Sequence, residues 1–147
     1  MSTGEVGKIL NEILGVTEVN VYGVSITNMD GKAGMASLVL PSSNFPPNFD
    51  FLNLSSLLRL RLPSYARPIF LRFRMAEHDK TSTLKLIKVK YVRQGYQYLK
   101  IEEEGDQVWF WPDYKKDDPC QVGNNENEWI RVNESIFQEI ESGQFKL

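Results

Sequence analysis

Two runs of β-favouring residues lie close together near the start of the chain, over residues 18–27 and 33–40. The residues Asn28, Met29, Asp30 and Gly31 join them, and Gly31 can take the positive φ that a tight turn needs. We therefore expect the two runs to pair as an antiparallel hairpin. This hairpin commits the chain to a fold built on a sheet, against which the neighbouring helices must pack.

Two amphipathic helices and a third strand are predicted around this hairpin. The first helix starts at a capping box on Ser2 and is expected to end at Gly15. Asp50 is in position to cap the second helix, and Pro63 stops it. The third strand covers residues 69–75, and its side chains should alternate between the two faces of the sheet. One face is assigned to Ile69, Leu71, Phe73 and Met75, and the other to Phe70, Arg72 and Arg74.

The second half of the chain is less regular. A short helix is expected to end near Gly95, and Asn133 is in position to cap a last helix with Ile136, Phe137 and Ile140 inward. Between them, residues 101–128 are rich in Asp, Asn, Gly and Pro, which favours a long loop. The sequence thus predicts one small α+β domain over residues 1–147. Helices pack on about three strands, and an acidic insertion lies around residues 112–127.

Charge is distributed unevenly behind a net charge of −2. Residues 1–101 carry thirteen basic against seven acidic side chains, whereas residues 102–128 carry nine acidic against two basic ones. A basic body suits an anionic ligand, and the alternative is a solvated mixed surface. Cys120 is the only cysteine, which excludes an internal disulfide and agrees with a reducing, cytosol-facing compartment. The chain lacks a run of about 18 apolar residues, so this segment is expected to be soluble.

Several kinds of chemistry are absent from the sequence. There is no glycine-rich phosphate loop, and one Cys with one His cannot form a Cys/His metal site. His78 lies between two acidic residues and is expected to be a surface residue. Trp109 and Trp111 could stack on bases, but a strand edge that covers the core is the favoured interpretation. No nucleic-acid motif is present. The residues alone therefore indicate only an α+β domain with a basic face.

Five short strings add a family resemblance. They are residues 18–24 (EVNVYGV), 30–36 (DGKAGMA), 62–68 (LPSYARP), 81–85 (TSTLK) and 95–96 (GY). Their order and spacing resemble the C-terminal region of the fatty acid transport proteins, also called very-long-chain acyl-CoA synthetases, in the adenylate-forming superfamily. The resemblance covers most of residues 1–96, and residues 108–142 fit the family's closing strand and helix more loosely.

The resemblance implies a two-step ligase reaction. A long-chain fatty acid and ATP give acyl-adenylate and pyrophosphate, and CoA then displaces AMP. The large N-terminal domain of the same polypeptide would hold ATP, Mg²⁺ and the acyl chain, while the small C-terminal domain rotates between the steps. The fragment alone is expected to be inactive and to bind no cofactor or metal. The parent protein would work at the cytosolic face, with any membrane association made outside this segment, and nucleic acid is not an expected partner.

Lys85 lies where the family has its catalytic lysine. The fatty acid carboxylate and the α-phosphate are both anionic, and a positioned ammonium group lowers their repulsion. Arg67, Arg72 and Lys88 are candidate contacts for nucleotide or CoA phosphates, and Arg74 is a further candidate because guanidinium suits phosphate. The alternative for each of these residues is a solvated charge or a structural ion pair.

Two departures from the family pattern motivate another function. Ser82 stands where family members usually have glycine, in the TGTFK pattern that reads TSTLK here. Serine restricts the backbone of the segment that must present Lys85. The acidic insertion around residues 112–127 also looks longer than usual. A non-catalytic interaction module that retains the fold is therefore the alternative to a ligase lobe.

Overall fold

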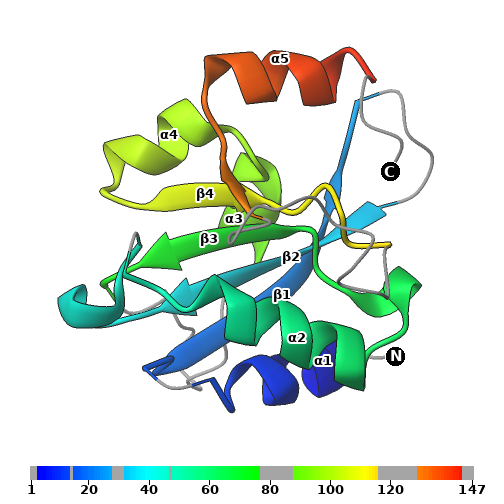
Figure 1. Cartoon of the computed structure of the whole chain (residues 1–147). Helices are drawn as coiled ribbons and strands as arrows, with labels where there is room; N and C mark the ends of the chain where they lie inside the picture. The colour runs from blue at the N-terminus through cyan, green and yellow to red at the C-terminus, as the bar shows by residue number, and fades with distance from the viewer. Residues whose placement is uncertain are drawn as a thin grey trace.

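One mixed sheet runs through the middle of the molecule, with helices on both of its faces (Figure 1). The computed structural model describes residues 3–13, 15–27, 32–46, 48–76, 88–115 and 129–143. Within these ranges the sheet has five strands in the order β1-β2-β3-β4-β5, and only β2 and β3 run parallel. The strands are β1 Glu18–Ser25, β2 Lys32–Val39, β3 Phe70–Arg74, β4 Gln107–Phe110 and β5 Ile130–Arg131.

The predicted hairpin is present as β1 and β2. Their antiparallel register pairs Glu18 with Val39 at one end and Ser25 with Lys32 at the other. The predicted turn, residues 28–31, lies outside the described residues. Gly34 of β2 is needed for space, because a Cβ there would lie 3.2 Å from Cα of Pro68. The chain can therefore pass close to the hairpin just before it enters β3.

The first helical layer contains α1, Thr3–Leu10, and α2, Phe51–Arg61, on the same face of the sheet (Figure 1). The α1 helix ends earlier than predicted, and Gly15 takes a φ of +92° in the connection that follows. The proposed capping residue Ser2 is outside the described residues. At α2 the prediction is confirmed, because the Asp50 side chain accepts a hydrogen bond of 3.1 Å from the Asn53 amide. This helix forms the crossover between parallel strands β2 and β3.

The second helical layer contains α3, Val89–Gln94, α4, Tyr98–Glu103, and α5, Glu134–Glu141. The expected end of α3 is confirmed at Gly95, which has a φ of +50°. The expected cap of α5 is also confirmed, since the Asn133 side chain accepts a 2.9 Å hydrogen bond from the Ile136 amide. Phe137 packs its ring on Tyr96 with 5.6 Å between centroids, which attaches α5 to the end of α3.

The central strand β3 is buried along its whole length, and its side chains alternate as predicted. Phe73 makes an edge contact with Phe51 of α2, at 5.7 Å between ring centroids. On the opposite face, Phe70 stacks on Tyr96 at 4.9 Å. Because each face of β3 contacts a different helical layer, the strand divides the core into two halves.

The prediction of about three strands and an irregular stretch over residues 101–128 needs correction. The end of α4 and all of β4 fall in that stretch, and β5 adds a fifth strand. The strand pattern of β4 is only four residues long. The acidic residues and glycine around it favour a loop, which is why the sequence predicts an irregular stretch there. Residues 116–128 lie outside the described part of the chain. The α+β class itself is confirmed.

Candidate functional site

Residues 77–87 lie outside the described residues, and this segment contains three residues discussed above: His78, Ser82 and Lys85. The structure does place the two ends of the segment. Strand β3 and the bend at Ala76 precede it, and α3 follows it from Val89. The catalytic role of Lys85 remains a prediction.

A network of ion pairs joins the two ends of this segment. We call it the charge cluster, and it consists of Arg72, Arg74, Lys90, Glu104 and Asp106. Arg72 is fully buried and donates its Nε–H to Asp106 Oδ2 at 2.8 Å, and Arg74 Nη1 donates to the same oxygen at 3.0 Å. Lys90 Nζ lies 2.7 Å from Glu104 Oε1, which links the helix after the segment to the same network.

The cluster is completed by polar and aromatic side chains of α3 and β1. Gln94 accepts a hydrogen bond from Arg72 and donates one of 2.7 Å to Glu104. The guanidinium of Arg72 lies 4.9 Å from the ring centroid of Tyr91, which stacks in turn on Tyr22. Strand β3, helix α3 and the turn after α4 are therefore held together by charge-assisted hydrogen bonds and by the contact of Arg72 with the Tyr91 ring.

The two carboxylates of the cluster respond differently to their surroundings. Burial raises the pKa of Asp106, and its bonds and charge interaction with Arg72 oppose that rise. Burial would also raise the pKa of Glu104, but hydrogen bonds from Lys90 and Gln94 and the charge of Arg72 lower this pKa to about 2. Glu104 is therefore ionised throughout the physiological range.

Arg67, another candidate phosphate contact, is also buried. Its guanidinium donates to three backbone carbonyls: Leu62 O at 3.0 Å, Tyr114 O at 2.7 Å and Arg59 O at 3.3 Å. These bonds join the end of α2 to the chain that follows β4. Arg67 and Arg72 both direct their N–H groups at acceptors inside the domain, which favours the structural alternative over contact with a phosphate.

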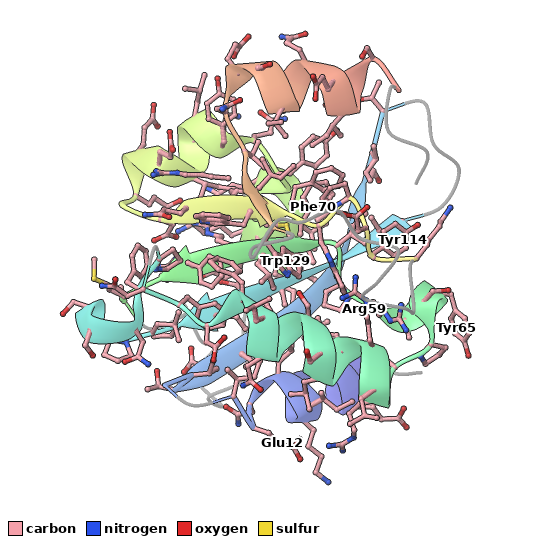
Figure 2. The ribbon with its side chains drawn as sticks, in the orientation of Figure 1. Glu12, Arg59, Tyr65, Phe70, Tyr114 and Trp129 are labelled. Atoms are coloured by element: carbon pink, nitrogen blue, oxygen red, sulfur yellow. The ribbon has the colours of Figure 1, made fainter. Side chains whose placement is uncertain are left out.

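An exposed aromatic side chain lies near Arg67, and no sequence motif marks it as functional. Tyr65 is 80% exposed and projects at the rim of the molecule (Figure 2). It lines a cavity of about 310 Å³ together with Lys32, Lys115 and the buried Arg67. The sequence feature that could have identified Tyr65 is an aromatic residue in a short turn after Pro63. An open ring beside two lysines can receive a planar, anionic molecule such as a nucleotide.

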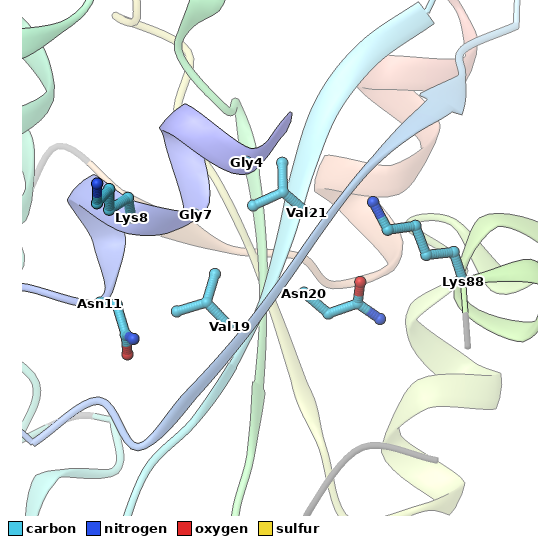
Figure 3. Close-up of a pocket in the computed structure, with 8 residues that line it drawn as sticks. All are labelled: Gly4, Gly7, Lys8, Asn11, Val19, Asn20, Val21 and Lys88. Carbon is cyan, nitrogen blue, oxygen red and sulfur yellow. The ribbon is translucent and has the colours of Figure 1, made fainter. Parts of the chain in front are cut away.

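Lys88 differs from the two buried arginines because it is exposed. It lines a second cavity, of about 340 Å³, with Gly7 and Lys8 of α1, Asn11 just after that helix, and β1 residues such as Asn20 (Figure 3). Of the three candidate phosphate contacts, Lys88 alone is exposed, because Arg67 and Arg72 are buried. The structure does not bring Arg67, Arg72 and Lys88 into one site.

Among the described residues, no group of three or more His, Cys, Asp or Glu side chains is placed to hold a metal ion. In the same part of the chain, no helix combines the length and the apolar character that a membrane crossing requires.

The structure is a small α+β domain, and the two cavities described above are lined by lysines. Comparison with known proteins shows which proteins the chain resembles. The homologues of this chain are long-chain fatty acid transport proteins, as the resemblance of the motifs predicted. Long-chain fatty acid transport protein 1 of Homo sapiens is 35% identical over 147 residues, which is 100% of this chain and 20% of that protein. The chain thus spans about a fifth of the length of such relatives.

Similarity extends beyond the transport proteins. Isopenicillin N epimerase component 1 of Hapsidospora chrysogena is 47% identical over 74 residues, covering 50% of this chain and 12% of that protein. Among solved structures, an o-succinylbenzoate CoA synthetase from Bacillus subtilis matches 65% of this chain and 18% of its own, with a TM-score of 0.49 and 21% identity. No protein-family model matches the chain.

Proposed function

We propose that this chain is the small C-terminal lobe of an AMP-forming ligase that joins a long-chain fatty acid to CoA. The observation that carries the proposal is similarity to long-chain fatty acid transport proteins over all 147 residues. The TSTLK string at residues 81–85 supports it, since its lysine matches the catalytic position of the family motif. The lobe works with a large domain that binds ATP with Mg²⁺ and the fatty acid.

In the first step, a carboxylate oxygen of the fatty acid attacks the α-phosphorus of ATP and pyrophosphate leaves. The Lys85 ammonium reduces the repulsion between the two anions and stabilises charge on the oxygens around phosphorus. At about 4 Å and an effective dielectric of about 20, this attraction is roughly 4 kcal/mol before desolvation. In the second step, the CoA sulfur attacks the acyl carbon and AMP departs.

The exposed cavities are proposed to serve the ligands of these steps. The Tyr65 ring offers a surface for a base, and Lys32 and Lys115 offer charge for phosphates. Lys88 is retained as a candidate contact for a nucleotide or CoA phosphate because its side chain is exposed. Arg67 and Arg72 are assigned to holding the lobe together.

The test of this function is Lys85→Ala in a ligase that contains this domain. We expect acyl-adenylate formation to fall by at least about 100-fold, a loss of about 2.7 kcal/mol of transition-state stabilisation. Conversion of supplied acyl-adenylate to acyl-CoA should stay within about twofold of the parent rate, because that step does not use the α-phosphate attack. Single-turnover release of radiolabelled pyrophosphate measures the first step, and thioester formation measures the second.

Lys80→Ala is the matched control, because it removes a lysine from the same segment without touching the motif. It should leave both half-reactions close to the parent rates. Equal loss of both half-reactions in Lys85→Ala, or loss of neither, would refute the assigned role. A full-length protein that forms no adenylate at all would favour the non-catalytic interaction module.

A further inference from the structure

We infer that Asp106 is a positioning residue for adenylation, acting through Arg72 and Arg74 on the two ends of the segment that carries Lys85. The inference rests on the proposed function. It assigns a task to the charge cluster, whose members lie on three elements: strand β3, helix α3 and the turn between α4 and β4.

The entry to the segment is held by Arg74. Its Nη1 donates to Asp106 at 3.0 Å while its Nε donates to the Ala76 carbonyl at 3.2 Å. Ala76 is the last residue before the segment of residues 77–87. Asp106 therefore fixes a guanidinium that itself binds the backbone where the segment begins.

The exit from the segment is held by the same network. Lys90 lies two residues after Lys88 and pairs with Glu104 at 2.7 Å. Glu104 also accepts from Arg72 at 3.1 Å, and Arg72 in turn donates to Asp106. A chain of charge-assisted bonds thus connects the start of α3 to the end of β3, with Asp106 as the shared acceptor of both arginines.

The burial of the arginines and Asp106 at the centre of this network indicates positioning more than stability. Arg72 is completely buried on a central strand, and Asp106 is only 4% exposed. Replacing a buried ion pair by apolar side chains of similar volume is often neutral or stabilising, so we attribute this pair to the geometry that it imposes. Here the imposed geometry is the separation and direction of the two chain ends that bracket Lys85. Misplacement of a reacting group by about 1 Å can cost about 100-fold in rate.

The experiment measures both half-reactions of a ligase containing this domain, for Asp106→Asn, Lys85→Ala and the double variant. Asparagine keeps the shape of the side chain and removes its charge. We expect Asp106→Asn to slow adenylate formation by about 10- to 100-fold and to change thioester formation by less than about twofold. In the double variant, Asp106→Asn should slow adenylation no further than Lys85→Ala alone, since a positioning residue has nothing left to position.

Several outcomes would overturn the inference. Equal slowing of the two half-reactions, or a further 10-fold loss on top of Lys85→Ala, would make Asp106 merely structural. If Lys85→Ala leaves adenylation intact, the proposed function fails instead, and the two failures are thereby distinguished. Glu102→Gln is the matched control, because it neutralises a carboxylate four residues before Asp106, on α4, and removes only an exposed ion pair with Arg131 of β5.

A second variant guards against misfolding of Asp106→Asn. Arg74→Gln keeps the pair between Arg72 and Asp106 and removes the donor that binds the Ala76 carbonyl. It should slow adenylation selectively, by about 3- to 10-fold, and retained thioester formation shows that the lobe is folded. If Arg74→Gln leaves adenylation at the parent rate, the Ala76 contact has no positioning role and the inference is wrong.

Discussion

Trp129 sits at the point where the chain returns to the sheet, and its indole N–H is buried. The Nε1 atom donates to Ser55 Oγ of α2 across 3.0 Å, and both residues are almost fully buried. This bond joins two segments 74 positions apart in the chain. A buried donor that loses its acceptor costs more than the bond itself contributed, because water cannot replace the partner.

Ser55→Ala should therefore destabilise the domain by about 1–3 kcal/mol. Urea unfolding of the isolated domain, followed by tryptophan fluorescence, measures the loss. Ser56→Ala is the control on the same helix, because Ser56 is exposed, and it should change stability by less than about 0.5 kcal/mol. Similar values for both variants would contradict the importance of the indole bond.

The two buried arginines show that the sequence reveals the chemistry of a side chain but not its partners. Arg67 and Arg72 have the chemistry of phosphate contacts. The alternation along β3 correctly predicted that Arg72 and Phe73 point to opposite faces of the sheet. Their partners could not be read, since Tyr114 and Asp106 are 47 and 34 positions away. Tyr65 is the reverse case: no periodicity marks it, and its exposure follows only from the way the turn sits on the hairpin.

Among the helices, α5 depends strongly on its first turn. Ile140 is its only buried residue, and the Asn133 side chain satisfies the Ile136 amide at 2.9 Å. A helix of eight residues is too short to be stable by itself, so caps and tertiary contacts decide whether it forms.

Asn133→Ala should cost about 1 kcal/mol of unfolding free energy, whereas Asn133→Asp should be nearly neutral because aspartate also caps. Hydrogen exchange of the α5 amides is the second readout, and it should accelerate in the alanine variant before the sheet amides do. If alanine and aspartate behave alike, the cap is not what holds this helix.

The elements that could be predicted from the sequence are those whose ends are marked by capping or helix-stopping residues. Asp50 and Pro63 mark both ends of α2, and Gly95 marks the end of α3, so local chemistry defines these helices. The strand β4 lacks such signals and exists because β3 offers an unpaired edge, with Phe70 opposite Phe110 in the register. Pairing across about 40 positions is a tertiary event that local pattern does not encode.

The molecule as a whole should lose stability in acid through Glu104 of the charge cluster. The folded pKa of Glu104 is about 2, below its ordinary value of 4.5, so the folded state binds fewer protons there than the unfolded state does. The stabilisation is complete above pH 4.5 and disappears as the pH falls towards 2. Glu104→Gln should therefore show a smaller loss of unfolding free energy between pH 6 and pH 3 than the parent domain shows.

Urea titrations at the two pH values measure this difference. Glu103→Gln is the neighbouring control, because its side chain is exposed and no described bond joins it to the cluster. That variant should keep the acid sensitivity of the parent. An unchanged pH dependence in Glu104→Gln would show that the cluster does not control acid unfolding.

The stacked indoles of Trp111 and Trp129 have a consequence for how this fold can diversify. Their centroids are 5.0 Å apart, so the polypeptide leaves the sheet and returns to it at nearly the same point. Closing such a gap depends only logarithmically on the number of intervening residues, and doubling that number costs only about 0.6 kcal/mol. Descendants of this sequence can thus gain or lose acidic residues there, or accept a grafted peptide tag, while the architecture beneath remains intact.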